Sequence, residues 1–175
     1  MTKNHNYFLN LAFQLAEKNL GRTGLNPSVG SVVVKNNSVI SSGVTSIKGR
    51  PHAEFNALNS IKNFAGSTLY TSLEPCIHYG ITPPCTDIII KKKIKNVFFG
   101  HEDPDVRTFK KAKKILIIKG IKARLIKSKK FENFYRSYLI NKKFKTPFIS
   151  AKIAISNDYF SINKKKKWIS NIFSR

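Results

Sequence analysis

The sequence predicts an α/β fold in which one β-sheet is covered by helices, and three observations support this prediction. The chain has 175 residues, enough for one domain with a full core, and 41% of them are hydrophobic. From residue 67 onward, β-branched or aromatic runs alternate with stretches of helical periodicity, a pattern typical of a sheet between helices. No apolar run approaches the roughly 20 residues of a membrane-spanning helix, so we expect a soluble protein without a membrane partner.

The first part of the chain predicts a helix, a hairpin and a second helix. Residues 7–19 place their apolar side chains on one helical face, and a loop follows from Gly21. Two β-branched runs, SVVVK and SVISSGV, flank Asn36 and Asn37, which is typical of a hairpin with a two-residue turn. From His52 onward, HAEFNALNSI again has its apolar residues at helical spacing.

The second part predicts alternating strands and helices, followed by residues from Asp158 onward that have no clear periodicity. The predicted elements are a strand over 67–73, a helix over 86–92, a strand over 95–100, a helix over 109–120, a strand over 121–127, a helix over 130–142 and a strand over 147–156. Gly120 closes the helix predicted over 109–120.

The net charge of +23 raises the question of a nucleic-acid partner, because clustered Lys and Arg neutralise phosphates. Lysine supplies 26 of the 32 basic residues, and the lysine runs lack the arginines and aromatic residues that favour base stacking or groove reading. We therefore expect a solvated basic surface and no nucleic-acid partner.

The N-terminus and the cysteine content indicate the compartment. The first twenty residues contain no continuous apolar stretch and no small-residue cleavage site, so we expect no export signal and a cytoplasmic location. In a reducing compartment, a pair of cysteines is more often a metal site or a reactive group than a disulfide.

Four residues form a pattern that points to metal chemistry: His52, Glu54, Cys76 and Cys85. A catalytic zinc site supplies three protein ligands and leaves the fourth tetrahedral position for water, and one His with two Cys meets this count. Glu54 lies two residues after His52, where it can reach a bound water without being an obvious ligand. The order H-x-E, then P-C and a second Cys on the next helix, is the pattern of zinc deaminases, in which a glutamate carries the proton.

Each of these residues alone could be structural: a buried helix histidine, two inert core cysteines and a first-turn acid that stabilises the helix dipole. Their occurrence in this order, with a proline before each cysteine, favours the metal site. A closed structural zinc site would need a fourth ligand, and only His78 lies nearby in the sequence.

Three motifs together resemble a known family. The stretch LEPCIHYGITPPC, with HAE and NPSVGSVVV upstream, closely resembles the deaminase domain of the bifunctional riboflavin-biosynthesis deaminase/reductase, over residues 7 to about 145. The eight residues between the cysteines set this chain apart from nucleic-acid and nucleoside deaminases, which have two. The resemblance implies a three-layer cytidine-deaminase-like α/β fold with a mixed central sheet. It also implies deamination of 2,5-diamino-6-ribosylamino-4(3H)-pyrimidinone 5′-phosphate.

The resemblance also assigns site residues. It implies that Glu54 is the acid/base, that Asn26 lines the substrate pocket, and that Asp103 holds the ribose phosphate part. The implied zinc ligands are His52, Cys76 and Cys85.

The chain departs from the family pattern near the expected ribose phosphate. The family usually has His in place of Thr45, Lys or Arg in place of Ile81, and Asn in place of Asp105. A lost charge-assisted contact is commonly worth about 1.5–3 kcal/mol, and an aspartate repels a phosphate, so we expect altered or weakened substrate binding. Arg50 is a candidate for a compensating substrate contact, the alternative being a solvated loop arginine.

The likeness divides the chain into residues 1–146, the expected zinc deaminase domain, and residues 147–175, which resemble the start of a reductase domain without the remainder. We expect a homo-oligomer and a separate reductase as possible partners. Two alternatives stay open. The first is a tRNA or nucleoside deaminase, which would explain the basic charge. The second is a degenerate relic that serves as a partner of that reductase, which would explain the altered pocket.

Overall fold

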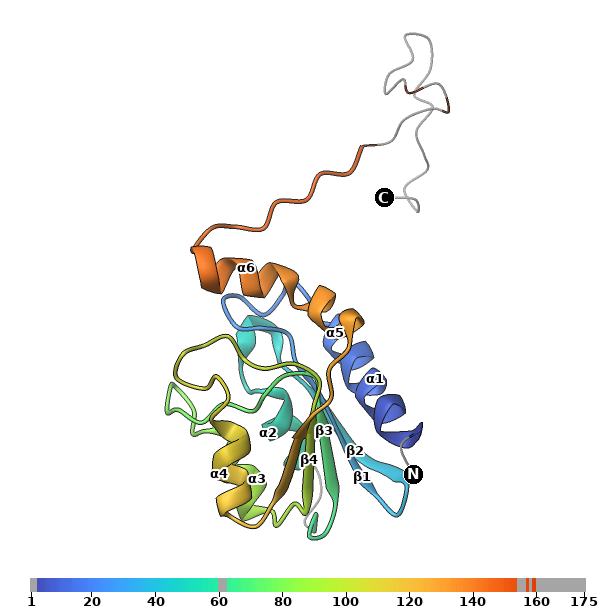
Figure 1. Cartoon of the computed structure of the whole chain (residues 1–175), viewed down its shortest axis with the longest axis vertical. Helices are drawn as coiled ribbons and strands as arrows, with labels where there is room; N and C mark the ends of the chain where they lie inside the picture. Colours follow the sequence, from blue (N-terminus) through green and yellow to red (C-terminus); the bar gives the residue numbers. More distant parts are fainter. Residues whose placement is uncertain (1–2, 60–62, 154–156, 158, 160–175) are drawn as a thin grey trace.

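The computed structural model describes residues 3–59, 63–153, 157 and 159, and it contains a five-stranded sheet with the order β2-β1-β3-β4-β5 (Figure 1). Strand β1 pairs antiparallel with β2 and β3, whereas β3, β4 and β5 are parallel. The predicted mixed sheet is therefore confirmed. The strands are β1 (Gly30–Lys35), β2 (Ser38–Val44), β3 (Thr68–Thr71), β4 (Asn96–Phe99) and β5 (Lys122–Leu125).

Helices cover both faces of the sheet, which confirms the three-layer architecture. α1 and α5 lie on one face, α2, α3 and α4 lie on the other, and α6 continues from α5 beyond the end of the sheet (Figure 1). None of the helices in the described residues is long and apolar enough to cross a membrane. The helical elements are α1 (Lys3–Glu17), the short 3-10 helix η1 (Ile47–Gly49), α2 (Ala53–Leu58), α3 (Cys85–Lys91), α4 (Ala112–Ile118), α5 (Lys129–Phe134) and α6 (Arg136–Phe144).

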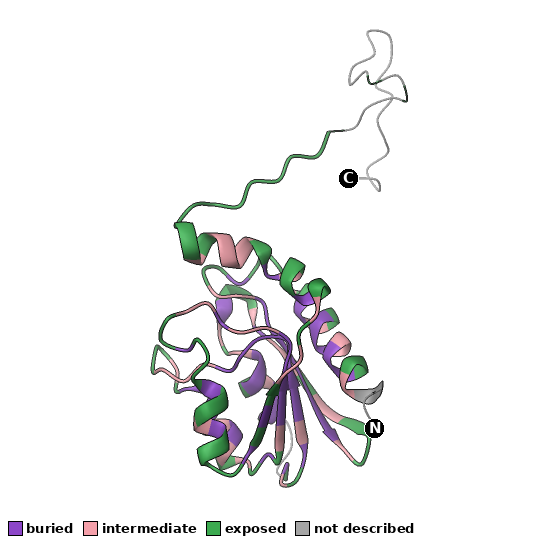
Figure 2. Ribbon diagram, in the orientation of Figure 1, coloured by how far each residue is buried: buried purple, intermediate pink, exposed green. Residues whose placement is uncertain are grey.

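The alternation of side chains along β1 divides the core into two layers. Val32 and Val34 pack with the residues of α1 and α5, while Val33 packs with those of α2, α3 and α4. Successive side chains of a strand point to opposite faces, so a strand covered on both sides is apolar throughout. The buried residues accordingly concentrate on the three central strands β1, β3 and β4 (Figure 2), whereas the edge strand β2 has none.

Two local features fix the N-terminal hairpin and the helix that packs on it. Asn36 and Asn37 have φ of 49° and 63°, the left-handed conformation of a type I′ turn, so the predicted two-residue turn is confirmed. Gly43 on β2 lies so close to α2 that an added Cβ would be 2.4 Å from the carbonyl oxygen of Ala53. The start of α2 is thus seated directly on the sheet.

The stretch predicted over 130–142 is helical, but the chain divides it into two helices that meet at Tyr135. Tyr135 is buried, and its hydroxyl lies 2.7 Å from the hydroxyl of Ser72 and donates to the carbonyl oxygen of Ser28 at 3.1 Å. These contacts join the α5–α6 junction to the ends of β1 and β3. Tertiary contacts of this kind override a continuous helical pattern.

The strand predicted over 147–156 is also wrong for its described part. Residues 147–153 are exposed and form no strand, and Figure 2 shows them leading away from the sheet. A strand needs a neighbour for its hydrogen bonds, and this segment pairs with neither edge of the five-stranded sheet. The remaining residues of that predicted strand, the end of the predicted helix at 60 and 61, and the region from 160 to 175 lie outside the described residues.

Candidate metal centre and its cavity

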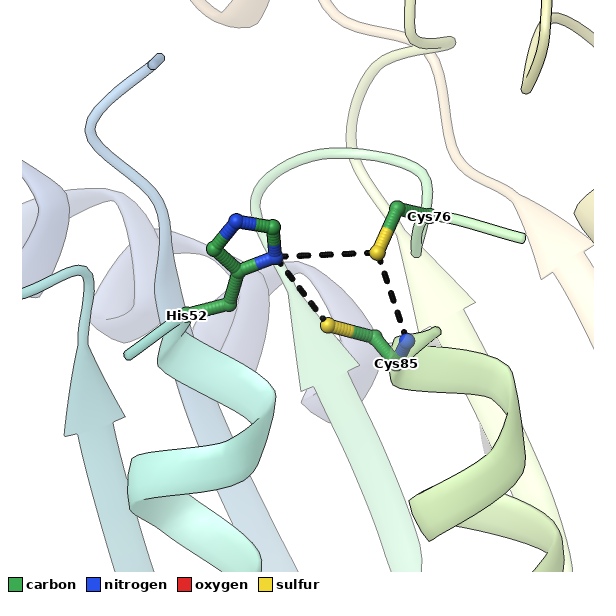
Figure 3. Close-up of side chains that lie close together, drawn as sticks. All are labelled: His52, Cys76 and Cys85. Carbon is green, nitrogen blue, oxygen red and sulfur yellow. Dashed lines mark hydrogen bonds between the residues drawn. The ribbon is translucent and has the colours of Figure 1, made fainter. Parts of the chain in front are cut away.

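Three predicted ligands converge from three elements. His52 is the N-cap residue of α2, Cys76 lies in the loop after β3, and Cys85 is the first residue of α3 (Figure 3). The Nδ1 atom of His52 lies 3.6 Å from the Sγ atom of Cys76 and 3.4 Å from that of Cys85. Their ligand atoms all lie within 4.8 Å of one another, and no other such group of His, Cys and acidic residues occurs in the described parts of the chain.

This spacing fits a small tetrahedral metal ion. Bonds of about 2.0–2.3 Å at tetrahedral angles separate ligand atoms by roughly 3.3–3.8 Å, and both His52–Cys distances lie in that range. An imidazole and two sulfurs form a donor set that suits zinc better than calcium or magnesium, which prefer oxygen. The donor set and its spacing therefore suggest a metal site.

Glu54 lies beside these ligands in the first turn of α2. Its side chain is 3% exposed, and one carboxylate oxygen accepts a hydrogen bond from the thiol of Cys85 at 3.4 Å. Burial, followed by the nearby charge of Cys76, raises the pKa of Glu54 to about 7. Such a carboxyl group can both accept and release a proton near neutral pH. We call His52, Glu54, Cys76 and Cys85 the candidate metal centre.

Cys76 is surrounded by hydrogen-bond donors that favour its thiolate. The backbone N–H of Cys85 donates to the sulfur of Cys76 at 3.3 Å. The side chain of Cys85 has the largest effect that lowers the pKa of Cys76, and His52 adds to it. The hydrogen bond with Cys76 in turn raises the pKa of His52. A thiolate is the form of cysteine that binds a metal.

A cavity opens beside the candidate metal centre and contains the three predicted substrate residues, Asn26, Arg50 and Asp103. The amide of Asn26 donates to the carbonyl oxygen of Gly49 at 3.1 Å, and Arg50 donates to the hydroxyl of Thr82. Asp103 is buried and accepts a hydrogen bond from the backbone of Asp105 at 3.0 Å. The structure thus brings all three to the cavity that His52, Glu54 and Cys76 also line.

The cavity also holds cations that the sequence analysis did not identify. The guanidinium of Arg107 donates to both carboxylate oxygens of Asp105, at 2.9 and 2.6 Å, and the ammonium of Lys142 lies 3.4 Å from Asp105. Tyr138 donates to Asp103 at 3.2 Å. Lys142 and Tyr138 come from α6, so no local motif links them to the loop after β4. We call Asp103, Asp105, Arg107, Tyr138 and Lys142 the rim.

The three departures from the family pattern have different environments. Thr45 lines the cavity, but it is buried and its hydroxyl accepts the backbone N–H of Val29 at 3.0 Å. Ile81 is 89% exposed and is not part of the cavity lining. Asp105 faces two cations, and the hydrogen bond from Arg107 is the largest effect that holds its pKa well below the usual range.

His78, the candidate for a fourth ligand, also lines the cavity. Its Nδ1 atom lies 3.1 Å from the hydroxyl of Thr108, and His78 is not in the group of possible metal ligands among the described residues. The geometry therefore favours three protein ligands and an open position over a closed four-ligand site.

Comparisons with known proteins agree on one family. The family described as the cytidine and deoxycytidylate deaminase zinc-binding region matches residues 2–101. A diaminohydroxyphosphoribosylamino-pyrimidine deaminase from Buchnera aphidicola is 37% identical over 134 residues, which are 75% of this chain and 91% of that protein.

Longer relatives match nearly the whole chain. The riboflavin biosynthesis protein RibD of Bacillus amyloliquefaciens is 35% identical over 173 residues, which are 97% of this chain and 47% of that protein. A solved structure of RibD from Acinetobacter baumannii has a TM-score of 0.81 and 34% sequence identity, and it covers 89% of this chain and 44% of that one. The chain spans about half the length of these relatives.

Proposed function

Because this chain belongs to the cytidine and deoxycytidylate deaminases, and among them to the deaminases of riboflavin biosynthesis, we propose that it deaminates 2,5-diamino-6-ribosylamino-4(3H)-pyrimidinone 5′-phosphate by hydrolysis. The reaction replaces the C2 amino group of the pyrimidine by oxygen from water and releases ammonia. The observation that carries the proposal is the convergence of His52, Cys76 and Cys85 beside a buried glutamate.

The proposed cofactor is zinc, held by His52, Cys76 and Cys85. When bound, zinc lowers the pKa of a coordinated water to roughly 7, which supplies a nucleophile at neutral pH. The mixed nitrogen and sulfur donor set supports this choice of metal. The thiolate character of Cys76 supports it further, because metal ligands bind in their deprotonated form.

Glu54 is the proposed proton carrier. Its carboxylate is placed to take the proton of the attacking water and to pass it to the amino group that leaves as ammonia. Burial raises the pKa of Glu54 to about 7. At neutral pH, neither gaining nor losing the proton therefore costs this carboxyl group much free energy. Because the side chain is 3% exposed, the carboxylate exchanges protons inside the site rather than with bulk water.

The rest of the cavity is the proposed substrate pocket. Asn26 and Asp103 offer polar groups to the base and the ribose, and Arg50, Arg107 and Lys142 supply positive charge for the phosphate. The pairing of Asp105 with Arg107 and Lys142 reduces the repulsion that an unpaired aspartate would exert on a phosphate. This arrangement supports an altered pocket that still accepts an anionic substrate.

The test is ammonia release by the zinc-loaded protein from the diaminopyrimidine ribosylamino phosphate, followed by mass spectrometry of the product. We expect turnover and a gain of about one mass unit as NH2 is exchanged for OH and tautomerises to the carbonyl. Absence of turnover at every substrate concentration, with stoichiometric zinc, would instead support the catalytically degenerate relic.

A nucleic-acid or nucleoside deaminase is the second candidate, and the net charge of +23 is the observation in its favour. Inosine formation in tRNA, with binding that weakens steeply as salt rises, would support that candidate. A separate reductase partner, homo-oligomerisation, the division at residue 146 and a cytoplasmic location remain predictions.

A further inference from the structure

Glu74 is a buried carboxylate in the cavity wall to which the proposed reaction assigns no role. It lies between β3 and Cys76, and it is 2% exposed. The salt bridges in the described part of the chain do not include it. A buried carboxylate without a cation must be compensated by hydrogen bonds, and those of Glu74 come from backbone amides.

The carboxylate of Glu74 binds both ends of one segment, residues 103–112. One oxygen accepts the backbone N–H of Asp103 at 3.3 Å and that of Lys110 at 3.1 Å. The other oxygen accepts the N–H of Ala112, the first residue of α4, at 3.1 Å. Three hydrogen bonds thus join a single side chain to a loop that is far from it in the sequence.

The segment adopts a conformation that its own sequence does not favour. Residues 109–120 have the pattern of one helix, but α4 begins only at Ala112. Lys110 has a φ of 58°, in the left-handed region that lysine rarely occupies. Because Glu74 binds the N–H of Lys110 and of Ala112, its carboxylate stabilises this late helix start.

This segment carries Asp103, Asp105 and Arg107, three of the five rim residues. A second contact supports the same arrangement, since His78 lies 3.1 Å from the hydroxyl of Thr108, which is fully buried. Glu74 and His78 both belong to the stretch that contains Cys76. The segment that carries the rim is therefore held against the loop that carries a metal ligand.

We propose that Glu74 is a positioning residue that sets the rim relative to the candidate metal centre. It acts through the backbone of residues 103–112 and not through contact with the substrate. The proposal rests on the proposed function for its effect on substrate binding, whereas its effect on the segment is independent of any substrate.

The variant Glu74→Gln tests the effect on the reaction. Glutamine keeps the shape but has one acceptor oxygen, so it places an amide N–H group against a backbone N–H donor. We expect KM to rise about tenfold, the loss of roughly one charge-assisted hydrogen bond, with kcat changed less than about threefold and zinc content unchanged. The matched control Glu132→Gln, at an exposed position on α5, should change neither constant. An unchanged KM in Glu74→Gln, or loss of zinc together with kcat, would overturn the proposal.

Limited trypsin digestion tests the effect on the segment without any substrate, so its outcome stands even if the proposed function fails. Arg107, Lys110 and Lys111 are cleavage sites within the segment, and Lys35 in the β1–β2 hairpin is an internal reference. We expect cleavage in the segment to be at least about tenfold faster in Glu74→Gln than in the parent protein, because local opening becomes easier. Cleavage at Lys35 should be unchanged. Equal rates in the two proteins, or a uniform acceleration at all sites, would contradict a positioning role.

If Glu74→Gln does not fold, amide hydrogen exchange in the parent protein decides. The amides of Asp103, Lys110 and Ala112 should exchange at least about tenfold more slowly than that of Val106, in the same segment, because each is bound by the buried carboxylate. Val106 is 81% exposed. Equally fast exchange at all four positions would refute the proposal.

Discussion

Three of the four residues of the candidate metal centre come from the starts of two helices and Cys76 comes from the loop after β3, whereas the rim is assembled from side-chain contacts between a loop and α6. His52 and Glu54 open α2 and Cys85 opens α3, so their places follow from secondary structure. Asp105 and Lys142 are 37 positions apart and meet only in the folded chain. A short sequence motif can predict the first kind of site, whereas the second depends on how the loops and α6 pack in the folded chain.

The two regions also differ in exposure. Glu54 and Cys85 are buried, but the side chains of Arg107 and Lys142 are 56% and 29% exposed. Buried charges interact strongly, whereas exposed ion pairs are screened and contribute little to stability. Changes in the candidate metal centre should therefore have large effects on the reaction, and changes in the rim should have smaller effects that involve binding.

The largest expected effect is that of Glu54→Gln. Without the proton carrier, kcat should fall by about 10²–10⁴-fold, the usual range for general acid–base catalysis. Zinc content should be unchanged, because Glu54 is not a proposed ligand. Steady-state kinetics and metal analysis measure both. A variant with more than a third of the parent activity would remove Glu54 from the mechanism.

The same variant should change stability in the metal-free protein. The pKa of Glu54 is raised from 4.5 to about 7, so its stabilising contribution is complete below pH 4.5 and is lost as pH rises through 7. Glutamine is neutral throughout. The stability advantage of Glu54→Gln over the parent should therefore grow by about 3 kcal/mol between pH 4 and pH 8, as measured by urea unfolding. A pH-independent difference would contradict the raised pKa.

A smaller effect is expected for the rim cations. Lys142→Ala should raise KM for the phosphorylated substrate by about tenfold, because a charge-assisted contact is lost, with little change in kcat. Lys143→Ala, which removes the neighbouring exposed lysine of α6, is the matched control. With the substrate lacking its phosphate, Lys142→Ala should behave as the parent does; an equal loss on both substrates would place Lys142 elsewhere in recognition.

The smallest effect is expected for Asp105→Asn. Hydrogen bonds from Arg107 lower the pKa of Asp105, so its contribution to stability is present above the unfolded pKa of about 3.9 and is lost as pH falls through the folded value. Since Arg107 is largely exposed, we expect a contribution of no more than about 1 kcal/mol. Parent and variant should converge in unfolding free energy when the pH is lowered from 6 to 2. Divergence in that range would contradict the assigned ion pair.

The difference between the two regions also explains how far the sequence could be read. The H-x-E pattern, the two P-C pairs and the Asn36–Asn37 turn depend on neighbouring residues, and the structure brings the predicted ligands together as the motifs indicate. The family resemblance also identified Asn26 and Asp103 in the cavity. These features need only local geometry or a motif.

The features that were missed depend on contacts between distant residues. The break at Tyr135 follows from its hydrogen bonds to Ser72 and Ser28, and the late start of α4 follows from Glu74. Residues 147–153 have a strand-like pattern but pair with no strand in the described chain. Lys142 carries no signal in its own sequence neighbourhood that links it to Asp105.

The central claim is the zinc site itself, and X-ray absorption at the zinc edge of the purified protein tests it most directly. We expect one zinc per chain, with two sulfur neighbours at about 2.3 Å and two nitrogen or oxygen neighbours at about 2.0 Å. Cys76→Ser and Cys85→Ser should each remove one sulfur neighbour or the metal altogether. A zinc-free protein after folding with excess zinc, or a shell of four light atoms in the parent, would contradict the account.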